Sequence, residues 1–175
     1  MKDLNALFKK GLAIVADSCG AEVIGNIRKV TINTRAKTRW GMCKMYNSGG
    51  HYSGYIIEIS DKILQDRVPE DATMSTIVHE ILHACKGGHG HKGLWKQYAD
   101  KVMRKYPNLT ITRTASAGFF GLSSGPGSTS QVALTYLIQC TNCGLKHYSS
   151  KLSKTIKYPY KYRCGRCGGE LKRIY

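Results

Sequence analysis

Apolar residues recur at helical spacing in three stretches of the chain. The first covers 4–19, the second begins at Pro69 and runs to about 85, and the third covers about 94–105. Each stretch predicts an amphipathic helix with one face in a core. The second has the most regular apolar stripe, in the i, i+3, i+4, i+7 series; it consists of Met74, Ile77, Val78, Ile81, Leu82 and Cys85.

A two-residue period marks the segment between the first two helices. Ile27–Asn33 alternates apolar and polar residues and is rich in β-branched types, which predicts a strand. Trp40–Tyr46 and Tyr52–Ile59 predict two more strands, joined as a hairpin by the turn Asn47-Ser48-Gly49-Gly50. A short helix is expected around Asp61–Gln65. The chain therefore predicts an α+β fold with a small antiparallel sheet.

The second predicted helix carries two histidines away from its apolar stripe. At about 100° per residue, His79 and His83 fall together on the opposite face, one turn apart and close enough to share a metal ion. With Glu80 they form the H-E-x-x-H pattern of a zinc hydrolase helix. Such a glutamate can take the proton of a metal-held water as general base. The alternative is a pair of solvated histidines on an exposed helix face.

A catalytic zinc site needs a third protein ligand, and two histidines follow the helix. His89 and His91 both lie just after a glycine pair that ends the helix and turns the chain back. In the metzincin pattern the third histidine lies six residues after the second, which would be His89. That pattern also expects a glycine where this chain has Lys86. Spacing alone therefore leaves both histidines open.

The wider pattern around the motif resembles a known family. His91 is followed four residues later by Trp95, and this arrangement after H-E-x-x-H resembles the SprT-like metalloprotease family, which includes the Spartan proteases that degrade proteins crosslinked to DNA. The upstream run from Thr38 to Cys43 resembles the glycine-containing strand that precedes the metal helix in that family. The resemblance covers about residues 5–110 and implies a zincin-like fold.

The resemblance also implies a choice of third ligand. In the family this ligand is a histidine four residues before an aromatic residue, which points to His91 rather than His89. One departure is the stretch between His83 and His91, which is shorter than in Spartan members, and it keeps His89 open as the alternative.

Composition changes after residue 112. Gly/Ser-rich sequence over 113–131 predicts a linker. Three apolar residues within it, Phe119, Phe120 and Leu122, are candidates for packing back onto the first domain. The expected organisation is thus a metalloprotease domain over 1–112, the linker, and a small second domain over 132–175.

Two C-x-x-C pairs separated by twenty residues identify this second domain as a zinc ribbon. Four thiolates fill a tetrahedron and leave no open position, so this zinc is expected to be structural. So short a unit needs the metal in order to fold. The alternatives are a redox pair or an iron–sulfur cluster. The predicted ligands are Cys140, Cys143, Cys164 and Cys167.

Net charge indicates a class of partner. The chain has 27 lysines and arginines against 11 acids, a net charge of +16, which favours a polyanion such as nucleic acid. In the predicted ribbon only Glu170 is acidic, and tyrosines lie among the cations. The alternative is that the lysines are solvated surface residues and the tyrosines pack in the core of the ribbon, without contact to nucleic acid. The residues expected to contact DNA are Lys146, Lys151, Lys154, Lys157, Lys161, Arg163 and Arg166.

These patterns and the family resemblance together predict a zinc metalloprotease with one catalytic and one structural zinc ion. Its expected partners are DNA, single-stranded or at a junction with duplex, and proteins bound or crosslinked to that DNA. No apolar run of about 18 residues occurs, and the N-terminus lacks signal-peptide features, so no membrane partner and a cytoplasmic location are expected, on the nucleoid in a bacterium or in the host cytoplasm for a phage protein. The rivals are a non-proteolytic DNA-binding regulator and a peptidase acting on free peptides.

Overall fold

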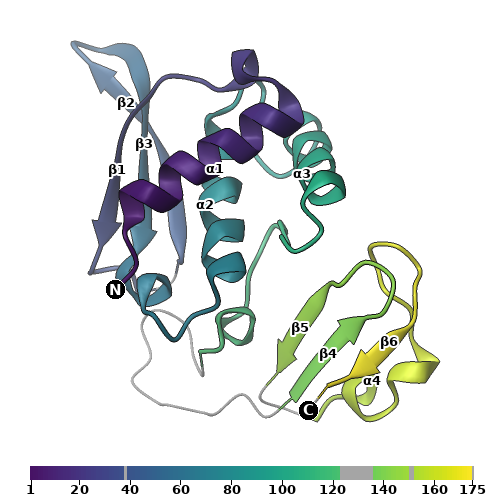
Figure 1. Ribbon diagram of the computed structural model, residues 1–175. Helices are drawn as coiled ribbons and strands as arrows, with labels where there is room; N and C mark the ends of the chain where they lie inside the picture. Colours follow the sequence, from purple (N-terminus) through teal and green to yellow (C-terminus); the bar gives the residue numbers. More distant parts are fainter. Residues whose placement is uncertain (38, 123–135, 150–151, 175) are drawn as a thin grey trace.

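The computed structural model describes residues 1–37, 39–122, 136–149 and 152–174, and places helices on one face of a three-stranded sheet in the N-terminal part (Figure 1). The N-terminal elements are α1 (Leu4–Cys19), η1 (Ala21–Val23), β1 (Ile27–Asn33), β2 (Gly41–Ser48), β3 (His51–Ser60), η2 (Asp61–Leu64), α2 (Glu70–Ala84), α3 (Leu94–Lys105) and η3 (Ala117–Phe120). The three long predicted helices and the first strand are confirmed, and the short helix expected around Asp61–Gln65 is η2. Strand β2 begins one residue later and ends two residues later than predicted, and β3 is one residue longer at each end.

Helix α1 lies across α2 at close range. Asp3 caps its start, because the Oδ1 atom accepts hydrogen bonds from two first-turn amides at 2.8 and 3.2 Å. Gly11 lies at the crossing, where a Cβ atom would come within 3.0 Å of Ile77 and Ile81. A glycine therefore allows the two helices to approach so closely, and the apolar stripe of α2 is buried as predicted.

The sheet corrects one expectation. It is mixed, with strand order β1-β3-β2, because β1 pairs parallel with β3 while β2 pairs antiparallel. The hairpin keeps β2 beside β3, and the chain leaving β1 crosses to the far edge before it forms β2. Strand β3 takes the centre, where its buried residues Tyr55, Ile57 and Ile59 remove the most apolar surface from water. This arrangement leaves β2 as an edge strand beside α2.

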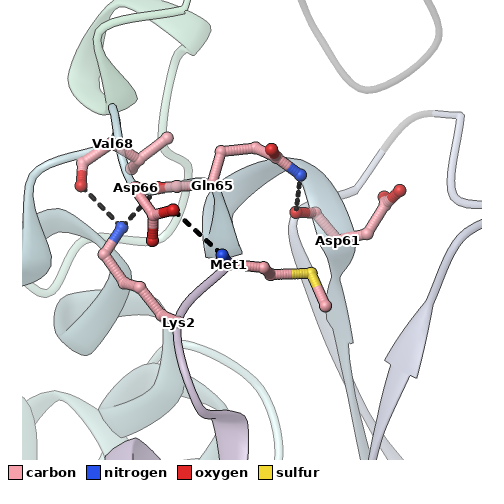
Figure 2. A network of polar contacts seen from close by, with 6 residues as sticks. All are labelled: Met1, Lys2, Asp61, Gln65, Asp66 and Val68. Carbon is pink, nitrogen blue, oxygen red and sulfur yellow. Dashed lines mark hydrogen bonds and ion pairs between the residues drawn. The ribbon is translucent and has the colours of Figure 1, made fainter.

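The chain start is fixed to the segment between η2 and α2 (Figure 2). The amino group of Met1 donates to Asp66 at 2.9 Å, and Lys2 Nζ donates to the carbonyl oxygens of Gln65 and Val68, both at 2.6 Å. Partial burial lowers the pKa of Lys2. These contacts hold the first turn of α1 next to the start of α2.

The apolar residues inside the predicted linker pack onto the first domain. Phe120 is fully buried, and its ring centroid lies 4.6 Å from that of Trp40. The indole Nε1 of Trp40 donates to the carbonyl oxygen of Ala115 at 3.0 Å. Leu122 is also buried, so the chain as far as 122 belongs to the first core, whereas residues 123–131 of the predicted linker lie outside the described residues.

The C-terminal part is a small antiparallel sheet with strand order β5-β4-β6. Its buried aliphatic residues are Leu137, Ile138 and Ile156. Its elements are β4 (Tyr136–Cys140), β5 (Lys146–Ser149), α4 (Lys154–Lys157), η4 (Pro159–Lys161) and β6 (Leu171–Arg173). Among the described residues, no helix has the length and apolar character needed to cross a membrane.

Candidate metal centre and active-site cleft

Three imidazoles converge at one end of α2. The Nε2 atoms of His79 and His83 are 3.2 Å apart, and Nε2 of His91 lies 3.1 Å from each of them. Tetrahedral zinc with Zn–N bonds of about 2.0–2.1 Å would place its ligand nitrogens about 3.3 Å apart. The donor set and its spacing therefore fit zinc, and the three histidines form a candidate metal-binding site.

Backbone carbonyls orient these rings. His83 Nδ1 donates to the carbonyl oxygen of Gly88 at 3.0 Å, which leaves the Nε2 lone pair free for a metal. His79 makes a hydrogen bond to the backbone of Thr112. Gly88 follows α2 directly, whereas Thr112 comes from a segment that follows α3. The site is thus assembled from one helix, the loop after it, and a segment after α3 that is distant in sequence.

Burial keeps the imidazoles in the form that binds metal. It is the largest cause lowering the pKa of His79 to about 3, and the neighbouring His83 and His91 lower it further. Burial also lowers the pKa values of His83 and His91. Because a metal ligand must be unprotonated, a site with these pKa values is ready for a cation at neutral pH.

Trp95 supports all three rings from one side. Its ring centroid lies 4.8 Å from that of His79, 5.5 Å from that of His83 and 4.8 Å from that of His91. The side chain is only 3% exposed. Trp95 therefore belongs to the hydrophobic core and also restricts the rotation of the three imidazole rings.

His89 lies apart from this cluster. Its Nε2 atom is 3.4 Å from the hydroxyl of Tyr55, on β3, and the metal-capable group contains His91 instead. His89 and His91 are two residues apart in one loop, and their rings contact different partners. The geometry thus favours His91 as the third ligand.

Glu80 is the single buried acid beside the three imidazoles in the described part of the chain. It leaves α2 towards β2, where a Cβ atom at position 41 would lie 2.6 Å from its Oε1 atom. The backbone N–H of Cys43 donates to the carboxyl group. Burial raises the pKa of Glu80 to about 8, although the Cys43 hydrogen bond and the charge of Arg39 partly offset this effect. A carboxyl group with this pKa exchanges its proton near neutral pH.

The raised pKa of Glu80 makes a prediction about the metal-free protein. An unfolded glutamate ionises near 4.5 and the folded one near 8, so the native state binds more protons and wild type loses stability as pH rises between these values. Glu80→Gln removes this loss. We expect the variant to be more stable by roughly 1–3 kcal/mol at pH 7 and equal to wild type near pH 4.5. Urea unfolding of chelator-treated protein across this range measures the difference, and a variant that is less stable at pH 7 would contradict it.

A cleft of about 900 Å³ contains this site. Its walls are β2, the histidine face of α2, the loop carrying His89 and His91, and the segment 110–115. Arg39 before β2 and Tyr55 on β3 line the cleft, whereas His51 and Tyr52 at the start of β3 do not. Arg113 also lines it, and no local sequence signal indicated this residue because it reaches the cleft only through the fold.

The four paired cysteines form the second candidate metal site. Their ligand atoms all lie within 4.8 Å of one another, with Sγ–Sγ distances of 3.5 Å for Cys140–Cys167 and 3.6 Å for Cys143–Cys164. Tetrahedral Zn–S bonds of about 2.3 Å imply about 3.8 Å. The N–H of Gly169 is the largest cause lowering the pKa of Cys167 to about 6. The cluster fits a structural zinc ribbon.

The predicted DNA-contacting residues fall into two groups. Lys146, Lys154, Lys157 and Lys161 keep their ammonium groups at or near the surface of the ribbon. The guanidinium groups of the two arginines instead donate to backbone carbonyls: Arg163 to those of Tyr160 and Tyr162, both at 3.2 Å, and Arg166 to that of Pro107 at 3.1 Å. Lys151 lies outside the described residues.

Comparison with known proteins now identifies the fold that carries this site. The model of the SprT-like family matches residues 15–115, which span the sheet, the metal helix and the third histidine. The chain belongs to the SprT-like family. Protein SprT-like of Lactiplantibacillus plantarum is 25% identical over 137 residues, which cover 75% of this chain and 80% of that protein. Protein SprT-like of Bacillus subtilis is 27% identical over 135 residues, covering 75% and 79%.

The two similarities extend further than the family match alone. The alignments are longer than the 101 residues of the family match, so they include residues outside 15–115. The SprT-like assignment therefore agrees with the resemblance seen in the motifs, and it supports a metallopeptidase-type domain. The four-cysteine cluster after this domain is shown by the structure.

Proposed function

We propose that this SprT-like protein is a zinc-dependent peptidase that acts on proteins bound or crosslinked to DNA. One observation carries the proposal: a buried carboxyl group, Glu80, lies beside three converging imidazoles in an open cleft. A purely structural zinc site has no need for a buried base. Burial raises the pKa of Glu80 to about 8, and strongly shifted pKa values are concentrated at functional sites.

Each residue of the site would have a separate role in peptide hydrolysis. His79, His83 and His91 would hold zinc, which supplies a Lewis acid for the scissile carbonyl and acidifies water. Glu80 would accept the proton of the attacking water and pass it to the leaving amine. Its raised pKa suits both steps, since the group releases and takes up a proton at neutral pH.

The edge strand suits an extended peptide substrate. Strand β2 pairs with β3 on one side only, and its other edge lines the cleft. Backbone groups on such an edge can pair with an added strand. The backbone N–H of Cys43 donates to Glu80 and so points away from β3. Alternate residues of a strand direct their backbone groups to the same edge, so Gly41 and Met45 can pair with the substrate backbone. A peptide bound there would run past the three histidines.

DNA is the proposed setting because of charge and exposed aromatic groups on the ribbon. The net charge of +16 favours a polyanionic partner. Tyr160 is 67% exposed, and Lys161 lies 5.1 Å from the ring centroid of Tyr158 and 6.0 Å from that of Tyr160. Lys157 lies 5.3 Å from the Tyr158 ring. Cations with accessible rings suit phosphates and unpaired bases together.

Cleavage of an unfolded protein with and without single-stranded DNA tests the proposal. We expect DNA to stimulate wild type, and Lys157→Gln/Lys161→Gln to lose the stimulation while keeping basal cleavage. Lys96→Gln/Lys101→Gln on α3 removes the same charge and should respond like wild type. A cleavage rate that does not change when DNA is added would favour a peptidase for free peptides. DNA binding without any cleavage would favour a non-proteolytic regulator.

Gly41→Ala offers a separate test of the position of Glu80. A Cβ atom would lie 2.6 Å from Oε1 and 2.7 Å from Cγ of Glu80, so the carboxyl group must move. Misplacement of a catalytic group by about 1 Å can lower a rate roughly 100-fold. We expect this loss in peptide cleavage with zinc content unchanged. Gly165→Ala is the control because open space surrounds position 165; full activity in Gly41→Ala would show that Glu80 needs no fixed position.

A further inference from the structure

A long acid-free segment crosses the N-terminal sheet. No aspartate or glutamate occurs between Glu22 and Glu58. Six lysines and arginines occur in the same interval, distributed over β1, the loop after it, and β2. Together they are called the basic face here: Arg28, Lys29, Arg35, Lys37, Arg39 and Lys44.

Strand register places the middle of the basic face on the side of the sheet away from the helices. Lys29 and Lys44 both pair in register with Ile56 of β3, so all three project from the same side. The neighbouring register position, Val30 with Ile57, packs into the core against the helices. The helices cover that one side only (Figure 1), which leaves Lys29 and Lys44 facing outward.

Most of this charge is uncompensated. Glu58 is the one carboxylate that forms an ion pair with the basic face in the described part of the chain, with Lys44 at 2.6 Å. It also accepts a hydrogen bond from Asn33 at 2.9 Å. Lys29, Arg35, Lys37 and Arg39 are exposed and form no ion pair with any described residue. Six cations against one carboxylate make a strongly positive surface.

An aromatic ring extends the basic face at its far end. Tyr46 lies two residues after Lys44 on the outward side of β2 and is 38% exposed. The guanidinium of Arg28 lies 5.3 Å from the centroid of this ring and donates to Ser53 Oγ at 2.6 Å. A tyrosine held under an arginine is a stacking platform of the kind that unpaired bases use.

We propose that the basic face is a second nucleic-acid binding surface, built into the peptidase domain itself and separate from the ribbon. The cations would contact phosphates of a single strand, and Tyr46 would stack with a base. The inference rests on the proposed function and extends it. Arg39 belongs to the basic face and also lines the cleft, so a strand bound there would pass the cleft mouth and bring an attached protein to Glu80.

The position of the charges favours nucleic acid over an acidic peptide substrate. Arg28, Lys29, Arg35 and Lys37 do not line the cleft. A peptide bound for cleavage therefore lies against Arg39 and Lys44 and leaves the others unused. A polyanion can follow Arg28, Lys29 and Lys44 along the outer side of the sheet and continue along the β1–β2 connection that carries the other three cations.

Binding of a labelled single-stranded oligonucleotide, titrated at several salt concentrations, tests the proposal on the full chain. The test variant is Lys29→Gln/Arg35→Gln/Lys37→Gln. The control is Lys96→Gln/Lys101→Gln/Arg104→Gln on α3, which removes the same residue types and lies across the domain from the sheet (Figure 1). Melting temperatures of all variants establish that they are folded. Lys157→Gln/Lys161→Gln reports on the ribbon separately.

We expect the test variant to weaken binding on the order of 10-fold, and the control to change it less than about 2-fold. The slope of log affinity against log salt should fall by about 2, the value for three lost phosphate contacts on a single strand. Tyr46→Ala should weaken the single strand more than a duplex of equal length. Equal affinity of the test and control variants for the oligonucleotide would show that the basic face does not bind nucleic acid, and the ribbon would remain the proposed binding surface. Wild type without oligonucleotide binding would overturn both, and losses seen only with phosphatidylglycerol vesicles would assign the surface to lipid.

Discussion

Glu80→Gln is expected to lower the rate of peptide cleavage at least 100-fold, with zinc content unchanged. General acid–base catalysis contributes about 10²–10⁴-fold, and the amide can neither take a proton from water nor pass one to an amine. The amide oxygen can still accept the hydrogen bond that Cys43 donates to the carboxyl group. The fold and the histidines should therefore stay in place. Initial rates on an unfolded protein, with zinc measured on the same samples, give the result.

The matched control for this variant is Glu22→Gln, which makes the same chemical change at an exposed position in η1. It should cleave at the wild-type rate. A Glu80→Gln variant that keeps more than about a tenth of the activity would remove Glu80 from the role of base. Loss of both activity and zinc would instead assign the residue to holding the site together.

His91→Ala is expected to release one of two zinc ions per chain and to abolish cleavage with it. The three Nε2 atoms lie within 3.2 Å of one another, so removal of one leaves two ligands on α2 and an incomplete site. Even residues that only support a ligand alter metal affinity about 10–100-fold, so loss of a ligand should weaken it by about 100-fold or more. Metal analysis after dialysis, together with a competitive zinc titration, measures the change.

His89→Ala decides between the two histidines of the loop. Its ring lies near the Tyr55 hydroxyl rather than in the cluster, so we expect both zinc ions to remain bound. The opposite pattern, with zinc lost from His89→Ala and kept by His91→Ala, would make His89 the third ligand. The two variants remove the same side chain from the same loop, so general disturbance of the loop cannot explain a difference between them.

Local periodicity made much of this fold and site predictable. The stripe from Met74 to Cys85 gave the helix and its buried face, and the position of His79 and His83 away from that stripe followed from the helical repeat. The cysteine spacing gave the second cluster in the same way. Each of these features depends on residues within one or two turns, or on a ligand pattern fixed by the geometry of the metal.

The features that the sequence did not predict depend on packing between residues that are far apart in the chain. Parallel pairing of β1 with β3 depends on where the chain crosses the sheet, and no residue in the β1–β2 connection encodes this crossing locally. The contact of Gly41 with Glu80 joins residues almost forty positions apart. Arg113 reaches the cleft because the chain after α3 returns past His79. Apolar residues such as Phe120 indicated packing, but they did not indicate Trp40 as the partner.

The most direct measurement is a zinc titration of metal-free wild-type protein, in which peptide cleavage and zinc occupancy are followed in one sample with single-stranded DNA present. We predict binding of two zinc ions per chain, with cleavage rising in proportion to occupancy of the histidine site and disappearing again when a chelator removes that ion. Two bound zinc ions without cleavage of any protein, with or without DNA, would contradict the assignment of this SprT-like chain as a peptidase.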